Sequence, residues 1–511
     1  MEDRDSQHLS PACSDQLLRV SEEPVKMLID GQWTESEHSE TFPIKNPATG
    51  EIVDTVPKGT REDIRHAVDA AYDAFPKWSA TLAVERSRLL FRLAILMRET
   101  QDELSSTLTK EQGKPVSESA GELIRFADLC EYYGGLATKL RGATQNISNQ
   151  SIYCDVLRQP VGVVGAIIPW NFPVSLFGFK LAPALAAGNT VIVKPASTTP
   201  LTDLKIGELV DKAGIPKGVV NIVTGPGSEV GQELSENEKV RKITFTGETG
   251  TGKAIMEACA KSVKRVTLEL GGSDPMIVCD DADLEIAVEA AVWGRFRNCG
   301  QSCTAVKRLF IFKNVYDSFL KKLTESVHRI KIGNGLDPAT LMGPLNNESQ
   351  RKEIEQQVED AKQRGAEVIT GGERPAGKDF ENGYFYLPTL LRNVADGSAI
   401  AKEECFGPVL PIFIINSLNE GIEMANSTTY GLGASIWTTN LITARIAAEK
   451  LEAGTVWINS PPITRIEVPF GGFKQSGLGR ELGTEGLDAY LEPKTIQVDV
   501  SGKKKTWQFF R

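Results

Sequence analysis

The chain is an acidic protein of 511 residues, and its composition excludes several classes of protein. It is 41% hydrophobic and 24% charged, which is ordinary for a globular enzyme of two or three domains. A net charge of −10 and a pI near 5.3 argue against nucleic-acid binding, because phosphate recognition needs a basic surface. No apolar run approaches the roughly 20 residues that cross a bilayer, so we expect neither nucleic acid nor membrane as a partner.

The N-terminal segment and the cysteines predict a cytoplasmic protein. Residues 1–25 are polar and acid-rich, unlike a signal or transit peptide, and we expect them to form a mobile tail. The eight cysteines are scattered, with no CxxC pair and no zinc-like spacing. We therefore expect free thiols in a reducing compartment and no metal site.

Residues 61–140 have the apolar periodicity of helices, and strands then alternate with helices. We expect strands at 161–168, 190–193, 219–223 and 242–245, separated by helices from about Leu181, over 201–213 and near 228–236. Such closely spaced β–α alternation predicts a doubly wound parallel sheet. A second α/β block extends from about Ser273 to Gly483.

Two segments far apart in the sequence, 151–157 and 495–500, alternate apolar and polar residues like half-exposed strands. They could pair in a small sheet, whose uncovered edge would favour oligomerisation. A hairpin that lies on its own domain is an equally good interpretation.

Cys303 and Glu269 carry the chemistry that the sequence indicates. Cys303 ends the Gly-Gln-Ser-Cys run of residues 300–303, and none of the four histidines lies in a motif typical of Cys–His proteases. A thiol is nucleophilic only as the thiolate, so it needs another source of activation. Glu269 lies in an apolar run before two glycines, where a carboxyl with a raised pKa can act as a general base. This pair indicates thioester chemistry rather than peptide hydrolysis.

Two further motifs follow predicted strands, where open α/β sheets bind ligands. Asn171, in the Pro-Trp-Asn-Phe-Pro run of residues 169–173, could donate a hydrogen bond to an oxyanion, although turn chemistry alone would explain it. Lys194 and Ser197 could hold the hydroxyls or a 2′-phosphate of an adenosine ribose, although a lysine at a strand end is more often merely solvated.

The glycine-rich run from Gly247 to Lys253 resembles a P-loop that opens a helix. Ala254 stands where a P-loop needs the Ser or Thr that holds magnesium, so a P-loop NTPase is a weak alternative and a simple helix cap a better one. No GxGxxG fingerprint occurs in the first predicted βα turn, so a standard dinucleotide site is not predicted.

Taken together, the motifs resemble those of the aldehyde dehydrogenase superfamily over almost the whole chain. They occur in the family's order at residues 169–173, 194–195, 245–247, 268–272, 300–303, 404–408 and 469–472. The resemblance implies an α/β fold of two doubly wound domains plus a small β oligomerisation sheet, in a homodimer or homotetramer. It assigns 26–139 and 161–270 to a dinucleotide-binding domain, 271–483 to a catalytic domain, and 140–160 with 484–511 to the oligomerisation strands.

The resemblance also implies a mechanism. Cys303 would attack the aldehyde as thiolate, while the Asn171 side chain and the Cys303 backbone N–H hold the oxyanion. Hydride would leave for a nicotinamide, and Glu269 would activate the water that hydrolyses the resulting thioester to the acid. Because family members that transfer the acyl group to coenzyme A lack a carboxylate at position 269, hydrolysis is favoured.

The same resemblance implies NADP or NAD as cofactor. Glu404 would grip the nicotinamide ribose, and a serine at 197, where many NAD-specific members carry glutamate, would accept a 2′-phosphate. NADP should therefore be tolerated and could be preferred, whereas Glu248 is unfavourable beside a pyrophosphate unless it points away. The predicted cofactor-binding residues are Ile167, Ile168, Pro169, Trp170, Lys194, Ser197, Gly227, Gly247, Glu248, Leu270, Glu404 and Phe406.

Arg297, six residues before Cys303, suggests a substrate with a carboxylate. Succinate-semialdehyde dehydrogenases have arginine at this place, and a guanidinium can grip a carboxylate with two parallel hydrogen bonds. That subfamily usually has a further arginine where this chain has Phe179, so the carboxylate pocket is incomplete unless Arg465 supplies the missing charge. Three alternatives stay open: a structural salt bridge at Arg297, a longer or partly apolar aldehyde acid, and a broad-specificity aliphatic or aromatic aldehyde dehydrogenase with an aromatic aldehyde beside Phe179.

Overall fold

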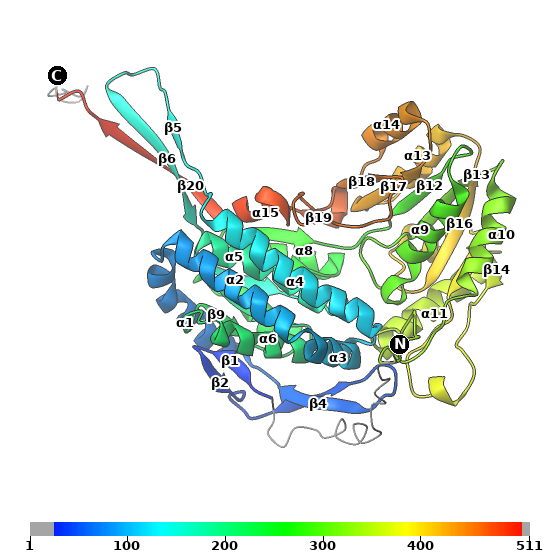
Figure 1. The fold of residues 1–511 in the computed structure, drawn as a ribbon, viewed down its shortest axis with the longest axis horizontal. Coiled ribbons are helices and arrows are strands. Elements are labelled where there is room, and N and C mark those ends of the chain that lie inside the picture. The colour runs from blue at the N-terminus through cyan, green and yellow to red at the C-terminus, as the bar shows by residue number, and fades with distance from the viewer. Residues whose placement is uncertain (1–24, 503–511) are drawn as a thin grey trace, which may run out of the picture.

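The computed structural model describes residues 25–502, so residues 1–24 of the predicted tail and residues 503–511 lie outside the described part. The described chain forms two α/β lobes and a projecting arm (Figure 1). The sheet of the first lobe has the order β19-β11-β10-β7-β8-β9-β1-β2, with β7 to β11 parallel. Its strands are β1 (Met27–Ile29), β2 (Gln32–Thr34), β7 (Val163–Ile167), β8 (Thr190–Lys194), β9 (Val220–Ile222), β10 (Val240–Thr246), β11 (Arg265–Glu269) and β19 (Gly477–Leu478).

The helices of the first lobe confirm the helical periodicity of residues 61–140. They are α1 (Arg61–Ser79), α2 (Ala83–Glu99), α3 (Gln101–Gln112), α4 (Val116–Ala137), α5 (Pro173–Ala187), α6 (Leu201–Lys212), α7 (Gln232–Glu236), which follows a π-helical turn at Gly227–Gly231, and α8 (Thr249–Ala260). α4 packs against both α2 and α5.

The expected start of α5 at about Leu181 is wrong, because the helix begins at Pro173. Pro173 is compatible with the first helical turn, and every residue of α5 is buried, so no polar face marked its beginning.

The second lobe confirms the predicted second α/β block. Its sheet has the order β14-β15-β16-β13-β12-β17-β18, with strands β12 (Pro275–Val278), β13 (Arg308–Phe312), β14 (Glu367–Thr370), β15 (Thr389–Arg392), β16 (Val409–Ile415), β17 (Gly433–Trp437) and β18 (Thr455–Ile458). Its helices are α9 (Leu284–Phe296), α10 (Tyr316–Val327), α11 (Glu348–Gln363), α12 (Ala399–Lys402), α13 (Leu418–Asn426) and α14 (Leu441–Lys450). The chain then returns to the first lobe, where β19 pairs with β11 and α15 (Gly483–Asp488) follows.

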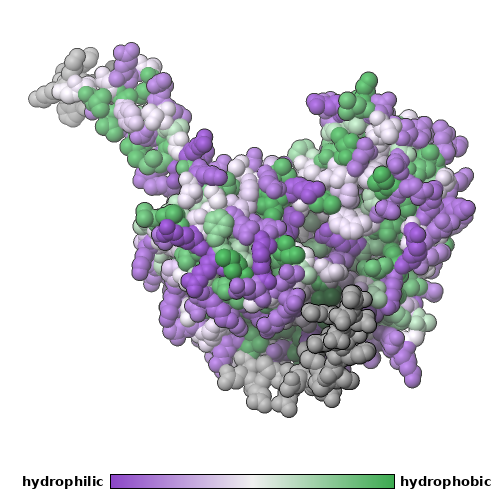
Figure 2. Space-filling view, viewed as in Figure 1, coloured by the Kyte–Doolittle hydropathy of each residue, from purple (hydrophilic) through white to green (hydrophobic). Residues whose placement is uncertain are grey.

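The arm is an antiparallel sheet of β5 (Ala143–Gln145), β6 (Ile152–Pro160) and β20 (Leu491–Asp499). The predicted pairing of the two distant strands is confirmed, with Asp499 opposite Ile152 and Leu491 opposite Pro160. The arm extends away from both lobes and carries apolar side chains on its surface (Figures 1 and 2). The alternative of a hairpin lying on its own domain is therefore wrong.

Two smaller features complete the fold. A separate hairpin of β3 (Thr41–Lys45) and β4 (Ile52–Pro57) precedes α1. Within residues 25–502 no helix combines the length and the apolar character needed to span a bilayer.

Candidate active site

Cys303 follows a loop with an unusual backbone. α9 ends at Phe296, and in the short turn that follows Asn298, Cys299 and Gly300 have φ angles of 50°, 57° and 72°. A Cβ atom on Gly300 would lie 2.2 Å from the carbonyl oxygen of Gly407, so only glycine fits there. Left-handed backbone at consecutive non-glycine residues is the kind of strain that collects at functional sites.

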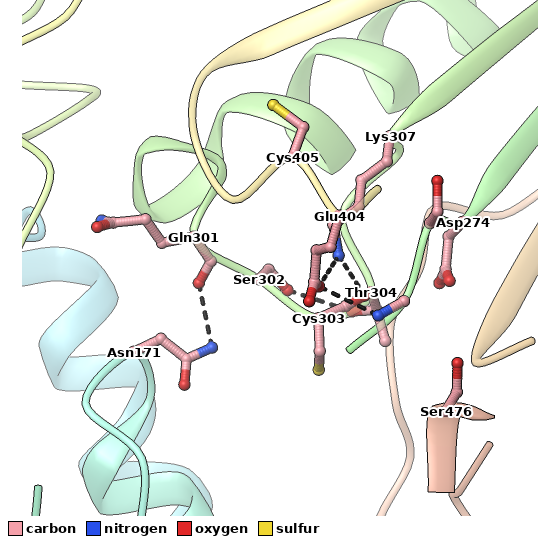
Figure 3. Close-up of polar contacts among 12 residues, drawn as sticks. Asn171, Asp274, Gln301, Ser302, Cys303, Thr304, Lys307, Glu404, Cys405 and Ser476 are labelled. Atoms are coloured by element: carbon pink, nitrogen blue, oxygen red, sulfur yellow. Dashed lines mark hydrogen bonds and ion pairs between the residues drawn. The ribbon is translucent and has the colours of Figure 1, made fainter. Parts of the chain in front are cut away.

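Hydrogen bonds tie this loop to Asn171, which follows β7 in the other lobe. The Asn298 side-chain amide donates to the carbonyl of Asn171 at 2.8 Å, and the Asn171 side-chain amide donates to the carbonyl of Gln301 at 3.2 Å (Figure 3). An amide group has two N–H bonds, and no described residue accepts the second one of Asn171 or the backbone N–H of Cys303. These two donors can serve a ligand oxygen.

The thiol of Cys303 is half-buried at the meeting point of two cavities, of about 580 and 390 Å³. Burial raises the pKa of this thiol to about 12, and the positive charge of Lys307 opposes the shift. At neutral pH the resting protein therefore holds Cys303 as a thiol, and thiolate formation needs electrostatic help.

Glu269 ends β11 and is 3% exposed. Burial raises its pKa well above the usual range, as its apolar sequence surroundings predicted, and the charge of Glu481 acts in the same direction. Neither carboxyl oxygen has a hydrogen-bond partner within the described residues. Glu269 is not among the residues that line the two cavities at Cys303; one carboxyl oxygen lies 2.9 Å from where a Cβ on Gly471 would be. Its charge nevertheless acts on the Cys303 thiol, so the two groups are near neighbours.

A third cavity, of about 680 Å³, adjoins the 580 Å³ cavity through residues 169–170 and 246–248, at the carboxyl ends of β7 and β10. These two cavities form one elongated groove, which we call the dinucleotide groove. Every residue predicted to bind the cofactor lines it: Ile167, Ile168, Pro169, Trp170, Lys194, Ser197, Gly227, Gly247, Glu248, Leu270, Glu404 and Phe406.

The polar groups of the groove fit a nicotinamide dinucleotide. The Lys194 ammonium is buried, donates to the carbonyl of Pro195 at 2.8 Å, and has its pKa lowered to about 8 by burial. Ser197 lies nearby, and its hydroxyl donates to the carbonyl of Gly225 at 3.2 Å. At the other end Phe406 packs edge-to-face on Trp170, with ring centroids 5.5 Å apart. A cation and a hydroxyl at one end and an aromatic wall at the other suit a ribose phosphate and a nicotinamide, respectively.

Glu404 has a partner that the sequence did not reveal. Its carboxylate forms an ion pair with Lys307 at 2.5 Å and accepts the backbone N–H of Gly272 at 3.1 Å. Lys307 also donates to the carbonyl of Cys303 at 2.8 Å (Figure 3). A buried lysine therefore connects the predicted ribose-binding carboxylate to the backbone of the predicted nucleophile.

Arg297 lines the 390 Å³ cavity, which we call the substrate cavity. Its guanidinium lies 4.7 Å from the ring centroids of both Phe172 and Trp293. No described residue accepts a hydrogen bond from this guanidinium or forms an ion pair with it, so the alternative of a structural salt bridge has no support. Arg465 is exposed and does not line the cavity, although its neighbours Thr464 and Ile466 do.

Arg125, on α4, is the second cation of the substrate cavity, and no motif in the sequence pointed to it. Its guanidinium lies 5.3 Å from the ring centroid of Phe179, which also lines the cavity, and donates to the carbonyl and hydroxyl oxygens of Thr464 at 3.2 and 2.6 Å. Burial, and then the charge of Arg297, lower the pKa of Arg125 to about 10. The charge expected from Arg465 is thus supplied from a different element.

The P-loop-like run lies along the dinucleotide groove. It opens α8 at Thr249, and Lys253 donates to the side chain of Gln475 at 2.9 Å. The residues of the run that line the groove are Gly247, Glu248, Thr249, Gly250, Thr251 and Lys253.

Comparison with known proteins identifies the family. The model described as "Aldehyde dehydrogenase family" matches residues 33–496. Glutarate-semialdehyde dehydrogenase of Pseudomonas putida is 43% identical over 92% of this chain and 97% of its own length, and the NADP(+) succinate-semialdehyde dehydrogenase GabD of Escherichia coli 42% over 91% and 96%. The structure of Staphylococcus aureus betaine aldehyde dehydrogenase in complex with NAD+ superposes with a TM-score of 0.93 at 38% identity, covering 96% of this chain and 98% of that one. The chain therefore belongs to the aldehyde dehydrogenase family and is an NAD(P)-dependent enzyme with that family's α/β fold, as its motifs predicted.

Proposed function

We propose that this enzyme oxidises a short aldehyde that carries a carboxylate at its far end, such as succinate or glutarate semialdehyde, to the dicarboxylic acid. The observation that carries the proposal is the pair of guanidinium groups, Arg297 and Arg125, on the cavity that ends at Cys303. Arg297 has aromatic neighbours, and within the described chain its guanidinium forms no ion pair or hydrogen bond, although its charge acts on the nearby Glu118 carboxyl. The glutarate- and succinate-semialdehyde dehydrogenases reported above as relatives support the same substrate class.

The carboxylates of the substrate cavity do not cancel this positive charge. Glu122 forms an ion pair with buried Lys114 and accepts the backbone N–H of Ser175 at 3.0 Å. Burial raises the pKa of Glu118, which favours its neutral form. Asp128, the third carboxylate of the cavity, forms an ion pair with Arg98 at 2.8 Å. An anionic substrate group would therefore meet two arginines whose neighbouring carboxylates are engaged elsewhere or favoured in the neutral form, whereas a cationic aldehyde such as betaine aldehyde would be repelled.

The mechanism begins with attack of the Cys303 thiolate on the aldehyde carbon, which forms the C–S bond. The aldehyde oxygen takes the negative charge and would accept hydrogen bonds from the free N–H groups of Asn171 and Cys303. Each such hydrogen bond typically stabilises the transition state by ~3–4 kcal/mol. When bound in the groove, the nicotinamide supplies the acceptor for the hydride. Glu269 then takes a proton from the water that cleaves the C–S bond of the thioester, which releases the acid and the thiolate.

NADP fits the adenosine end of the groove at least as well as NAD. Lys194 and Ser197 would hold a 2′-phosphate, because position 197 carries serine and not a glutamate that would repel it. The runner-up specificity, a broad aliphatic or aromatic aldehyde dehydrogenase, rests on the apolar part of the cavity lining, which includes Phe172, Phe179 and Phe470.

The substrate proposal predicts a charge preference that depends on both arginines. Initial rates with succinate semialdehyde and with butanal, a neutral aldehyde of equal carbon length, should differ about 100-fold in kcat/KM, which equals roughly 2.7 kcal/mol. Arg297→Gln should remove most of this preference by lowering kcat/KM for the semialdehyde alone. Arg125→Gln should lower kcat/KM for the semialdehyde about tenfold, a smaller effect, because the Arg125 guanidinium is already hydrogen-bonded to Thr464.

Arg465→Gln is the matched control, because this exposed arginine lies in the same loop as Thr464 but outside the cavity. It should leave both rates unchanged. Equal kcat/KM values for succinate semialdehyde and butanal in the wild type would contradict the substrate class while leaving the family activity intact.

Cofactor choice should depend on position 197. Ser197→Glu places a carboxylate where the 2′-phosphate is proposed to bind, so kcat/KM for NADP should fall about 100-fold, while that for NAD changes only a few-fold. Ser197→Ala removes only the hydroxyl and should cost NADP much less. A glutamate variant that uses NADP as well as the wild type would show that the 2′-phosphate binds elsewhere.

We further propose that the arm joins copies of this chain in a homodimer or homotetramer. Tyr153 and Val498 are cross-strand neighbours on β6 and β20 and are 49% and 46% exposed. Tyr153→Glu combined with Val498→Lys keeps a favourable cross-strand pair and removes the apolar surface. Light scattering should give a multiple of 55.7 kDa for the wild type and a smaller species for the double variant. A wild type that is already monomeric would contradict the proposal.

A further inference from the structure

Lys307 is a buried cation that the mechanism above does not use. Its side chain is 1% exposed and lines none of the cavities described above, so it contacts neither the substrate cavity nor the dinucleotide groove. Removing an ammonium from water costs several kcal/mol unless it is well paired. Here the ammonium is held by the Glu404 carboxylate at 2.5 Å and by the carbonyl of Cys303 at 2.8 Å.

The backbone keeps Lys307 in this position. Its N–H donates to the carbonyl of Asp274 at 2.9 Å, just before β12, and β13 begins at the next residue. Parallel pairing of β12 with β13 thus anchors the lysine from one side, and the Cys303 loop anchors it from the other. In Figure 3 the ammonium lies on the backbone side of Cys303, while the thiol points away from the Lys307–Glu404 pair. Lys307 therefore acts on the sulfur through space and not through a hydrogen bond.

The charged groups that act on the thiol are one cation and three carboxyls. Lys307 stabilises a thiolate, whereas Glu404, Asp274 and Glu269 oppose it. Asp274 is buried with its pKa raised to about 7, and Lys307 counteracts that shift as well. No histidine within the described chain lies beside Cys303, so the lysine is the nearest source of favourable charge.

We propose that Lys307 is a positioning residue that sets the ionisation of the Cys303 thiol, with the ion pair to Glu404 limiting its effect. The inference rests on the proposed role of Cys303 as nucleophile. A nearby positive charge favours the ionised form of a thiol. The two charges of the ion pair therefore act in opposite directions on Cys303: Lys307 favours the thiolate, and Glu404 favours the neutral thiol.

The proposal predicts shifts of opposite sign for the two partners. Lys307→Met removes the cation and leaves three carboxyls facing the sulfur, so the thiol pKa should rise. At a pH below the midpoint the thiolate fraction, and with it the alkylation rate, should fall about tenfold or more. Glu404→Gln removes a carboxylate and leaves the lysine unopposed, so the midpoint should move to lower pH. Lys307→Arg keeps the charge and should stay near the wild-type midpoint.

The test is the pH dependence of iodoacetamide alkylation in protein without cofactor. In this reaction the thiolate sulfur displaces iodide and forms an S–CH₂ bond, after the thiol proton has gone to solvent. No Lys or Arg lies between Cys299 and Cys303, so both fall on one tryptic peptide, and fragment ions in tandem mass spectrometry assign the modification to Cys303. Cys405 lies on a different peptide. Lys253→Met is the matched control, because that lysine lines the same cavity as Cys303 but donates to Gln475, and its profile should equal the wild type's.

A Lys307→Met midpoint equal to that of the wild type would overturn the proposal, as would shifts of the same sign in the Lys307→Met and Glu404→Gln variants. If Lys307→Met does not fold, judged by its thermal unfolding, the Glu404→Gln profile still decides, because an unchanged or raised midpoint contradicts the inference. Failure of the proposed function would look different. In that case alkylation of Cys303 would leave aldehyde oxidation intact, whatever its pH profile.

Discussion

Burial raises the pKa of both Cys303 and Glu269, so in the resting protein neither group holds the charge that its chemistry requires. Both lie at the ends of elements that two sheets bring together, where water is scarce and each charge counts for more than on the surface. The neighbouring cations and hydrogen-bond donors are therefore as important as the two reacting groups. In this account Lys307 stabilises the thiolate, and the free N–H groups of Asn171 and Cys303 stabilise the oxyanion. Arg297 stabilises the carboxylate that the substrate brings into the site.

The fold explains why so many charged groups can be buried in one place. The lobes supply different parts of the site: Asn171 follows β7 in the first, whereas Cys303 lies between α9 and β13 in the second. The bonds among Asn171, Asn298 and Gln301 join them without using the donors that a substrate oxygen needs. The return of the chain to the first lobe, through β19 beside β11, brings Gly471 against Glu269.

Much of this site could be predicted because its residues lie in short motifs at the ends of strands. Asn171, Lys194 and Glu269 each follow or end an apolar strand, and parallel strands place such ends along one edge, whereas Cys303 lies in the loop between α9 and β13. The predicted cofactor-binding residues all line one groove for the same reason. The division into domains at the predicted boundaries stays a prediction, and β19 shows that the sheets do not follow it strictly.

The residues that sequence reasoning missed act through tertiary contacts. Arg125 occupies one position of a long helix, and its role depends on α4 packing over Phe179. Arg465 has the right neighbours in the chain, but its own side chain is exposed. In the sequence Lys307 is an ordinary lysine before a predicted strand. Only the structure shows that it is buried and paired with Glu404 beside Cys303. The early start of α5 was hidden because a fully buried helix has no polar face.

The account depends on a thioester at Cys303 that Glu269 helps to hydrolyse, and that step can be seen directly. The most direct measurement is the mass of Glu269→Gln protein after mixing with succinate semialdehyde and NADP, with the modified residue located by peptide mapping. The account predicts one burst of NADPH equal to the enzyme concentration, followed by an acyl group that persists on Cys303. Sustained turnover by this variant, or a burst without any acyl adduct on Cys303, would contradict it.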